Sequence, residues 1–237
     1  MKKRFVAIVI FSMVALSLAY QTPNAETLIP VKNETAFESL KGEWHFIRNQ
    51  KGSPISAPPT FDIIEFLPQK KIRLHSTLDG KDFIGVVEIS ADTISYTFHP
   101  PEIEKPIQHQ LKIARSETKG DLTLIFKDRD EERGVVYTRP ENLLFSEVAG
   151  EWFAETPEGR ATMSLRKDGG FSMQNEVSGY YRAFNSYRGK AIMAALRFGE
   201  IDTHIVFWLY ERNGNKLKLV PLQGPSQGPT VIWSLSK

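Results

Sequence analysis

The sequence predicts an all-β protein made of two tandem barrels, each with eight short antiparallel strands in up-and-down order. Three observations support this: a five-residue phrase occurs twice, apolar and polar residues alternate, and turn residues recur at even intervals. The phrase is Leu40-Lys41-Gly42-Glu43-Trp44, and Val148-Ala149-Gly150-Glu151-Trp152 repeats it 108 residues later. A repeat of this length indicates two related domains.

Residues 1–25 are predicted to be a signal peptide. Lys2, Lys3 and Arg4 precede an apolar run from Phe5 to Tyr20, and Ala19 and Ala25 are small residues at suitable cleavage sites. The apolar run has 16 residues, whereas a helix needs about 20 to cross a bilayer. We therefore expect an exported protein with no stable membrane anchor after cleavage.

Composition narrows the compartment and the partners. The chain contains no cysteine, so each domain must be stabilised by its hydrophobic core. Secreted domains of eukaryotes often carry disulfides, so the absence of cysteine favours a bacterial periplasmic or secreted protein. Without the three basic residues of the signal peptide, the net charge falls from +2 to −1. A nearly neutral mature chain is not expected to bind nucleic acid.

The first domain is predicted to span residues 34–140, after a leader at 26–33 without regular structure. Thr35 and Glu38 fit a capping box and predict a short helical turn before Gly42. Period-two alternation and turn residues then predict eight strands, at about 44–48, 60–67, 70–76, 83–90, 93–98, 107–115, 121–127 and 134–139.

The second domain is predicted to span residues 143–237. Asp168-Gly169 and Asn213-Gly214 are strong hairpin signals. Eight strands are again expected, at about 148–155, 160–166, 170–176, 179–186, 190–198, 201–211, 215–221 and 229–236. Short antiparallel strands in this number favour closure into a barrel, which leaves no exposed sheet edge.

A short helical turn followed by Gly-x-Trp on the first strand resembles the lipocalin-like (calycin) barrels. The resemblance implies that Trp44 and Trp152 each close one end of a barrel, under an arginine from the last strand. Arg139 matches that arginine in the first domain, whereas Leu235 and Lys237 stand nearest to it in the second. It also implies a small apolar ligand inside a barrel, with Trp44, Arg139 and Trp152 at the barrel ends.

The predicted strand 201–211 is apolar on both faces. Val206, Trp208 and Tyr210 alternate with a second apolar set on the opposite face, although a half-exposed strand normally pairs an apolar face with a polar one. One explanation is a barrel strand whose outer face is covered by a local loop. The other is an interface, between the domains or with an envelope protein, formed by Val206, Trp208 and Tyr210.

No catalytic, metal or cofactor site is predicted. The five histidines lack the spacing of a zinc site, and no Gly-x-Ser-x-Gly elbow occurs. We therefore expect a non-catalytic binding protein of the cell envelope that holds a small apolar ligand in a barrel. The alternative is a structural or protein-interaction module in which the barrels are solid and the outer surface makes the contacts.

Overall fold

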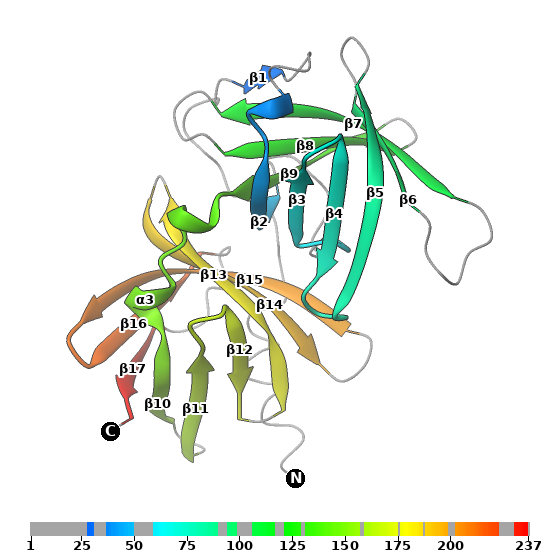
Figure 1. Ribbon diagram of the computed structural model, residues 1–237. Helices are drawn as coiled ribbons and strands as arrows, with labels where there is room; N and C mark the ends of the chain where they lie inside the picture. The colour runs from blue at the N-terminus through cyan, green and yellow to red at the C-terminus, as the bar shows by residue number, and fades with distance from the viewer. Residues whose placement is uncertain are drawn as a thin grey trace. The chain divides into compact units, whose positions relative to one another are not determined.

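The computed structural model describes residues 28–30, 37–49, 59–89, 94–98, 106–116, 121–128, 131–156, 159–174, 176–186, 188–198, 202–222 and 230–236. These residues fall into two compact units that divide between Pro140 and Glu141, and each unit is an antiparallel β structure (Figure 1). The predicted signal peptide, residues 1–25, lies outside the described residues, as does Lys237. Within the described ranges, no helix combines the length and the apolar character needed to cross a membrane.

The first barrel contains eight strands that each pair with the next in sequence, and its last strand pairs with its first. The strands form a nearly closed barrel, as predicted. Their bounds are β2 (Gly42–Asn49), β3 (Ile63–Leu67), β4 (Lys71–Ser76), β5 (Lys81–Ile89), β6 (Ile94–Phe98), β7 (Ile107–Ser116), β8 (Leu122–Asp128) and β9 (Glu131–Thr138).

One further strand was not expected. Residues 26–33 were predicted to lack regular structure, but β1 (Leu28–Pro30) pairs antiparallel with the end of β7, with Leu28 opposite Ser116. At this point β7 has run past the last residue that β6 covers, since Leu111 is opposite Ile94. The backbone groups of β7 that β6 leaves unpaired find a partner in β1.

The strands of the first barrel follow the predicted alternation. On β4, Ile72 and Leu74 are buried, whereas the alternate residues Arg73 and His75 lie on the outer face. Strand β2 has a bulge between Phe46 and Arg48, where its register against β9 shifts. The buried apolar side chains of the described part of this barrel are Phe37, Leu40, Trp44, Phe46, Ile47, Ile64, Phe66, Ile72, Leu74, Val87, Ile94, Tyr96, Ile113, Ala114, Leu122, Leu124, Val135, Val136 and Tyr137.

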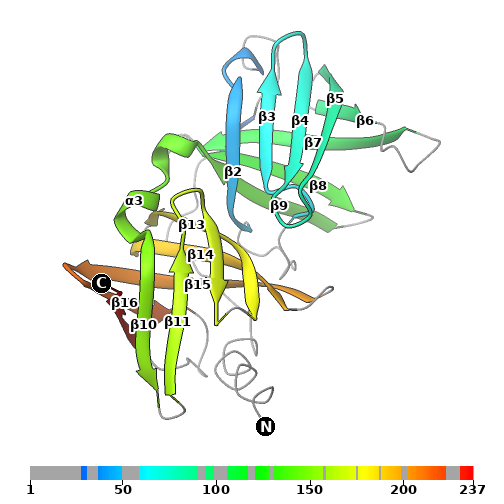
Figure 2. The same ribbon diagram turned by 60° about the horizontal axis from the view of Figure 1, so that its bottom comes forward.

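The second barrel is closed by the pairing of its last strand with its first, and Figure 2 shows this barrel from a second side. A 3-10 turn, η1 (Pro140–Asn142), and a single helical turn, α3 (Phe145–Val148), precede it. Its strands are β10 (Gly150–Thr156), β11 (Gly159–Leu165), β12 (Gly170–Met173), β13 (Val177–Ser186), β14 (Gly189–Phe198), β15 (Asp202–Asn213), β16 (Lys216–Pro221) and β17 (Val231–Leu235).

A continuous hydrophobic cluster fills the interior of the second barrel. Inward positions of all eight strands contribute to it, together with Val148 of α3. Six of its members are aromatic, which accounts for much of the space that an eight-stranded barrel encloses; they are Trp152, Phe171, Tyr181, Trp208, Tyr210 and Trp233.

Candidate functional sites at the barrel ends and on the outer faces

Each barrel holds its first tryptophan in the same way. Trp44 is fully buried, and its Nε1 donates a hydrogen bond of 2.8 Å to the carbonyl oxygen of Leu40. Trp152 is 1 % exposed, and its Nε1 donates across 2.9 Å to the carbonyl oxygen of Val148. Both acceptors belong to the helical turn four residues earlier, so the bond satisfies the buried indole and fastens that turn to the barrel end. The repeated sequence phrase is therefore a repeated structure.

The first barrel covers its tryptophan with the predicted arginine. The Cζ atom of Arg139 lies 3.9 Å from the centroid of the Trp44 ring, a distance at which a cation is attracted to the ring face. Its Nη2 also donates a hydrogen bond of 3.3 Å to the carbonyl oxygen of Ser39. Gly42 makes room for it, because a Cβ atom there would lie 2.7 Å from Arg139 Nη1.

The second barrel covers Trp152 with an arginine that sequence reasoning missed. The Cζ atom of Arg212 lies 5.5 Å from the Trp152 ring centroid, and its Nη1 donates a hydrogen bond of 2.6 Å to the carbonyl oxygen of Glu147. Ser39 and Glu147 each stand five residues before their tryptophan. The two arginines therefore contact equivalent carbonyls, although Arg212 comes from β15 rather than from the last strand.

The last strand supplies leucine in the second barrel. A Cβ atom on Gly150 would lie 2.6 Å from Cδ1 of Leu235, so Leu235 takes the space that Arg139 takes above Gly42. The sequence held one clue to the true partner. Arg212 continues the alternation of Trp208 and Tyr210 on β15 and so shares their inward face.

The prediction that Val206, Trp208 and Tyr210 form an interface needs correction. Each of the three is 4 % exposed, and all three belong to the hydrophobic cluster inside the second barrel. The apolar character of both faces is nevertheless real: on the outer face of β15, Ile205 is buried and Phe207 is half-buried. The error lay in deciding which face of the strand points inward, which period-two alternation alone does not determine.

A pocket of about 590 Å³ lies at the end of the second barrel next to α3 and is open to solvent. We call it the helix-end pocket. Glu147 of α3 is its central side chain: Oε2 accepts hydrogen bonds from Lys190 Nζ at 2.5 Å and from the Tyr210 hydroxyl at 3.0 Å. The residues that line the pocket are Glu147, Lys190, Tyr210, Glu211, Arg212 and Gly214.

The charges of the helix-end pocket shift two pKa values. The hydrogen bond from Lys190 lowers the pKa of the Glu147 carboxyl, and the bond from Tyr210 and the nearby charge of Arg212 act in the same direction. Burial raises the pKa of the Tyr210 hydroxyl, with a further contribution from its bond to Glu147. Glu147 is therefore ionised and Tyr210 neutral at physiological pH.

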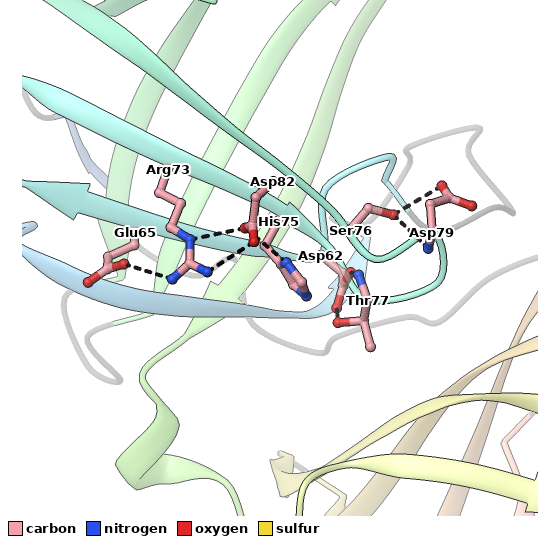
Figure 3. A network of polar contacts seen from close by, with 8 residues as sticks. All are labelled: Asp62, Glu65, Arg73, His75, Ser76, Thr77, Asp79 and Asp82. Atoms are coloured by element: carbon pink, nitrogen blue, oxygen red, sulfur yellow. Dashed lines mark hydrogen bonds and ion pairs between the residues drawn. The ribbon is translucent and has the colours of Figure 1, made fainter. Parts of the chain in front are cut away.

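A second polar site lies on the outer face of the first barrel (Figure 3). Arg73 forms a two-point ion pair with Asp82, Nε to Oδ1 at 3.0 Å and Nη2 to Oδ2 at 3.1 Å. The same Oδ1 lies 3.0 Å from His75 Nδ1, and Arg73 Nη1 lies 3.6 Å from Glu65 Oε2. These four side chains, Glu65, Arg73, His75 and Asp82, occupy outward positions of β3, β4 and β5, and we call them the polar row.

The ion pairs of the polar row shift the pKa values of two of its members. The hydrogen bonds from Arg73 lower the pKa of the Asp82 carboxyl, and the same pairing raises the pKa of Arg73. Glu65, Arg73 and His75 also line a small depression of about 160 Å³. Within the described ranges, no three histidine, aspartate or glutamate side chains gather in an arrangement that could hold a metal ion.

Beside the polar row, a buried aspartate fixes the turn between β4 and β5 (Figure 3). Asp62 is 2 % exposed, and its two oxygens accept hydrogen bonds from the backbone nitrogen and the hydroxyl of Thr77, at 2.6 and 2.7 Å. Ser76 donates a hydrogen bond of 3.1 Å to Asp79 in the same turn. These bonds satisfy buried polar atoms and hold the turn, so we assign Asp62 a structural role.

Comparisons with protein-family models, with curated proteins and with solved structures find no match to this chain. The tandem-barrel architecture and the two polar sites are therefore interpreted from the contacts of the chain itself.

Proposed function

We propose that this protein is an exported, non-catalytic binding protein of the cell envelope whose binding surfaces lie outside its barrel interiors. The observation that carries the proposal is the hydrophobic cluster inside the second barrel. Bulky side chains, among them Trp208 and Trp233, occupy the volume in which a lipocalin-type barrel would hold an apolar ligand. The interior of the second barrel thus favours the solid-barrel alternative, and the pockets at the end of the second barrel and on the outer face of the first favour binding at those places.

The charge pairs support a binding role over a catalytic one. In each polar cluster the carboxylate whose pKa is shifted is already bound to a cation, Glu147 to Lys190 and Asp82 to Arg73. Both carboxyl pKa values are lowered. A carboxylate stabilised in this way is a weak proton acceptor, since a general base works best with a pKa near the operating pH.

Native mass spectrometry of protein purified from its own host tests the solid-barrel proposal. The expected mass is that of the mature chain without a stoichiometric apolar molecule. A co-purified apolar ligand at one copy per chain, whose removal shifts the resonance of the Trp208 indole, would contradict the proposal and restore the lipocalin-type function.

Export is tested on the same material. The basic start and the apolar run predict cleavage after Ala19 or Ala25, which N-terminal sequencing of the envelope fraction would detect. Full-length chain that keeps Met1 and stays in the cytosol would contradict export.

One observation favours a protein partner as a second candidate function. Ile84 and Val86, on the outer face of β5, are 64 % and 56 % exposed and lie beside the polar row. Large apolar side chains next to charged ones are common at protein interfaces. A photo-crosslinking residue at position 84 should capture an envelope protein in intact cells, whereas one at position 160, on the second barrel, should not. Equal capture from both positions would rule this surface out.

A further inference from the structure

The helix-end pocket has the size and the construction of a small-molecule site. Its volume of about 590 Å³ falls within the range of about 300–1,000 Å³ that is typical of ligand pockets. Side chains from α3, β14 and β15 and the turn at Gly214 converge on it. It is therefore built by four separate parts of the fold.

The barrel interior changes character where it meets this pocket. Ile192 of β14 is opposite Trp208 of β15, and both lie in the hydrophobic cluster. The next inward position of β14 is Lys190, and the next two of β15 are Tyr210 and Arg212. The inward positions are therefore apolar within the barrel and become charged at the end next to α3. Tyr210 belongs to the hydrophobic cluster and also lines the pocket.

Two carboxylates and two cations line the pocket, but they do not all form ion pairs with one another. Lys190 is paired with Glu147 at 2.5 Å, and Glu211 is paired with Lys218, outside the pocket lining, at 3.2 Å. Arg212 donates only to backbone carbonyls, those of Glu147 and Gly214. Across the described parts of the chain, Arg212 forms no ion pair with a carboxylate. Arg212 is thus the lining cation whose hydrogen bonds go to neutral oxygens, and its guanidinium lines the pocket.

The hydrogen-bond donors identify the complementary chemistry. Arg212 uses one N–H of Nη1 and that of Nε for the two carbonyls, which leaves the second N–H of Nη1 and both N–H groups of Nη2. The ammonium group of Lys190 donates to Glu147 and has two further N–H groups. A planar guanidinium next to an ammonium matches the oxygens of a carboxylate or phosphate, which accept charge-assisted hydrogen bonds from both.

We propose that the helix-end pocket binds a small molecule through a single carboxylate or phosphate group held by Arg212 and Lys190. The Tyr210 ring and the aliphatic stems of the two cations provide an apolar wall for the rest of the molecule. The proposal rests on the proposed function, since it assigns a ligand class to one surface of a non-catalytic binding protein.

Nuclear magnetic resonance on the full mature chain tests the proposal with four probes. Hexanoate and hexyl phosphate carry the two candidate anions, and hexanamide and hexanol are their neutral counterparts. The reporter is the Trp152 indole N–H, because Arg212 covers its ring. We expect one or both anions to shift this resonance saturably, with weaker affinity at higher salt, while the neutral probes leave it in place. The anion that binds more tightly identifies the ligand group.

The Trp44 indole is the internal control, because it has the same hydrogen bond and its own arginine but belongs to the first barrel, none of whose described residues line the helix-end pocket. Arg212→Gln and Lys190→Gln should each weaken anion binding about tenfold or more, the loss expected for a charge-assisted hydrogen bond. Lys216→Gln removes an exposed charge of β16 that does not line the pocket and that forms no ion pair within the described residues, so it should leave the affinity unchanged. Lys190→Gln keeps the test valid if Arg212→Gln fails to fold.

Three results would overturn the proposal: no saturable shift with either anion, an equal shift with a neutral probe, or unchanged affinity in Lys190→Gln. These results would leave a surface-binding protein with solid barrels intact. Failure of the proposed function has a different signature, a saturable shift of the interior Trp208 indole by hexanol.

Discussion

In the first barrel, the arginine over the tryptophan follows β9, the last strand, whereas in the second barrel it lies on β15, the sixth. Both guanidinium groups nevertheless cover the ring of the equivalent tryptophan and donate to the equivalent carbonyl. The two barrels thus share the position of the guanidinium rather than its place in the sequence. In both, it lies above the indole and donates to a carbonyl of the helical turn. Any strand that ends at that rim can supply it.

Because the two arginines come from different strands, they have different neighbours. Arg139 fills the space above Gly42, but in the second barrel Leu235 fills the space above Gly150. Arg212 instead stands next to Lys190 and Tyr210 in the helix-end pocket. Arg212 therefore covers the tryptophan of the second barrel and also contributes a charge to the helix-end pocket.

Removal of Trp44 or Trp152 should lower the free energy of unfolding more than any of the other substitutions proposed below. Trp44→Ala and Trp152→Ala each leave a large cavity in a packed core and a helical turn without its hydrogen bond, so each should lower the free energy of unfolding by about 3–5 kcal/mol. Chemical denaturation measures this, and Ile232→Ala, at a side chain 56 % exposed, should change it by less than about 0.5 kcal/mol. A loss below about 1 kcal/mol in one barrel would show that its tryptophan does not hold that end.

Substitution of the equivalent glycines Gly42 and Gly150 should cause the next largest loss of stability. Gly42 has a φ of +101° and Gly150 one of +156°, and backbone strain predicts a cost of about 1–3 kcal/mol for alanine at each. The added Cβ would meet the tip of a long, flexible side chain at Arg139 but a methyl group of half-buried Leu235.

A double-mutant cycle separates the two barrels here. In the second barrel, Leu235→Ala should recover a large part of the stability that Gly150→Ala loses, because the leucine cannot move into solvent. In the first barrel, Arg139→Ala should recover a smaller part of the stability that Gly42→Ala loses, because the arginine can already move into solvent. Equal relief in the two cycles would mean that strain at the glycine, rather than its neighbour, sets both costs.

Loss of either arginine should cost less, about 1–2 kcal/mol, from a cation–ring contact and a hydrogen bond. Arg139→Gln should be the more damaging of the two, since its guanidinium lies 3.9 Å from the ring centroid and that of Arg212 lies 5.5 Å away. Denaturation of both variants beside wild type measures the difference. If Arg212→Gln proves worse, the shorter bond to the Glu147 carbonyl matters more than the ring.

The smallest expected effect is the change in stability with pH that arises from Asp82 and Glu147. The pKa values of Asp82 in the first barrel and Glu147 in the second are both lowered in the folded chain. Each carboxylate therefore adds stability above its unfolded pKa, near 4, and this is lost as pH falls through the folded pKa. With side chains 45 % and 35 % exposed, each contributes less than about 1 kcal/mol.

The measurement for both carboxylates is the free energy of unfolding between pH 7 and pH 3. Asp82→Asn and Glu147→Gln should each be less stable than wild type at pH 7, and the gap should close towards pH 3. A gap that stays constant over this range would show that the charge of the carboxylate is not responsible.

Much of the fold followed from the sequence, because alternation and turn residues are local properties. The repeated Gly-Glu-Trp phrase and hairpin signals such as Asn213-Gly214 placed the strands of both barrels within a few residues. The inward face of β15 did not follow, since a strand that is apolar on both sides fits either orientation until its register is known. Strand β1 was missed because three residues carry no periodic pattern.

The candidate sites were less predictable than the fold. Arg139 could be found because it follows the last predicted strand of its barrel, the position that the resemblance to lipocalin-like barrels indicated for an arginine. Arg212, Lys190 and Glu147 meet only after the second barrel closes, and nothing in their sequence spacing indicates that they share a pocket. The polar row is likewise a product of register, which places His75 opposite Asp82.

The placement of the four tryptophans gives the molecule an uneven optical signature. Trp44 belongs to the first barrel, whereas Trp152, Trp208 and Trp233 all belong to the core of the second. Intrinsic fluorescence therefore follows mainly the second barrel, while far-ultraviolet circular dichroism follows both sheets. If the barrels unfold at different denaturant concentrations, the two curves will separate, and the fluorescence midpoint will mark the second barrel.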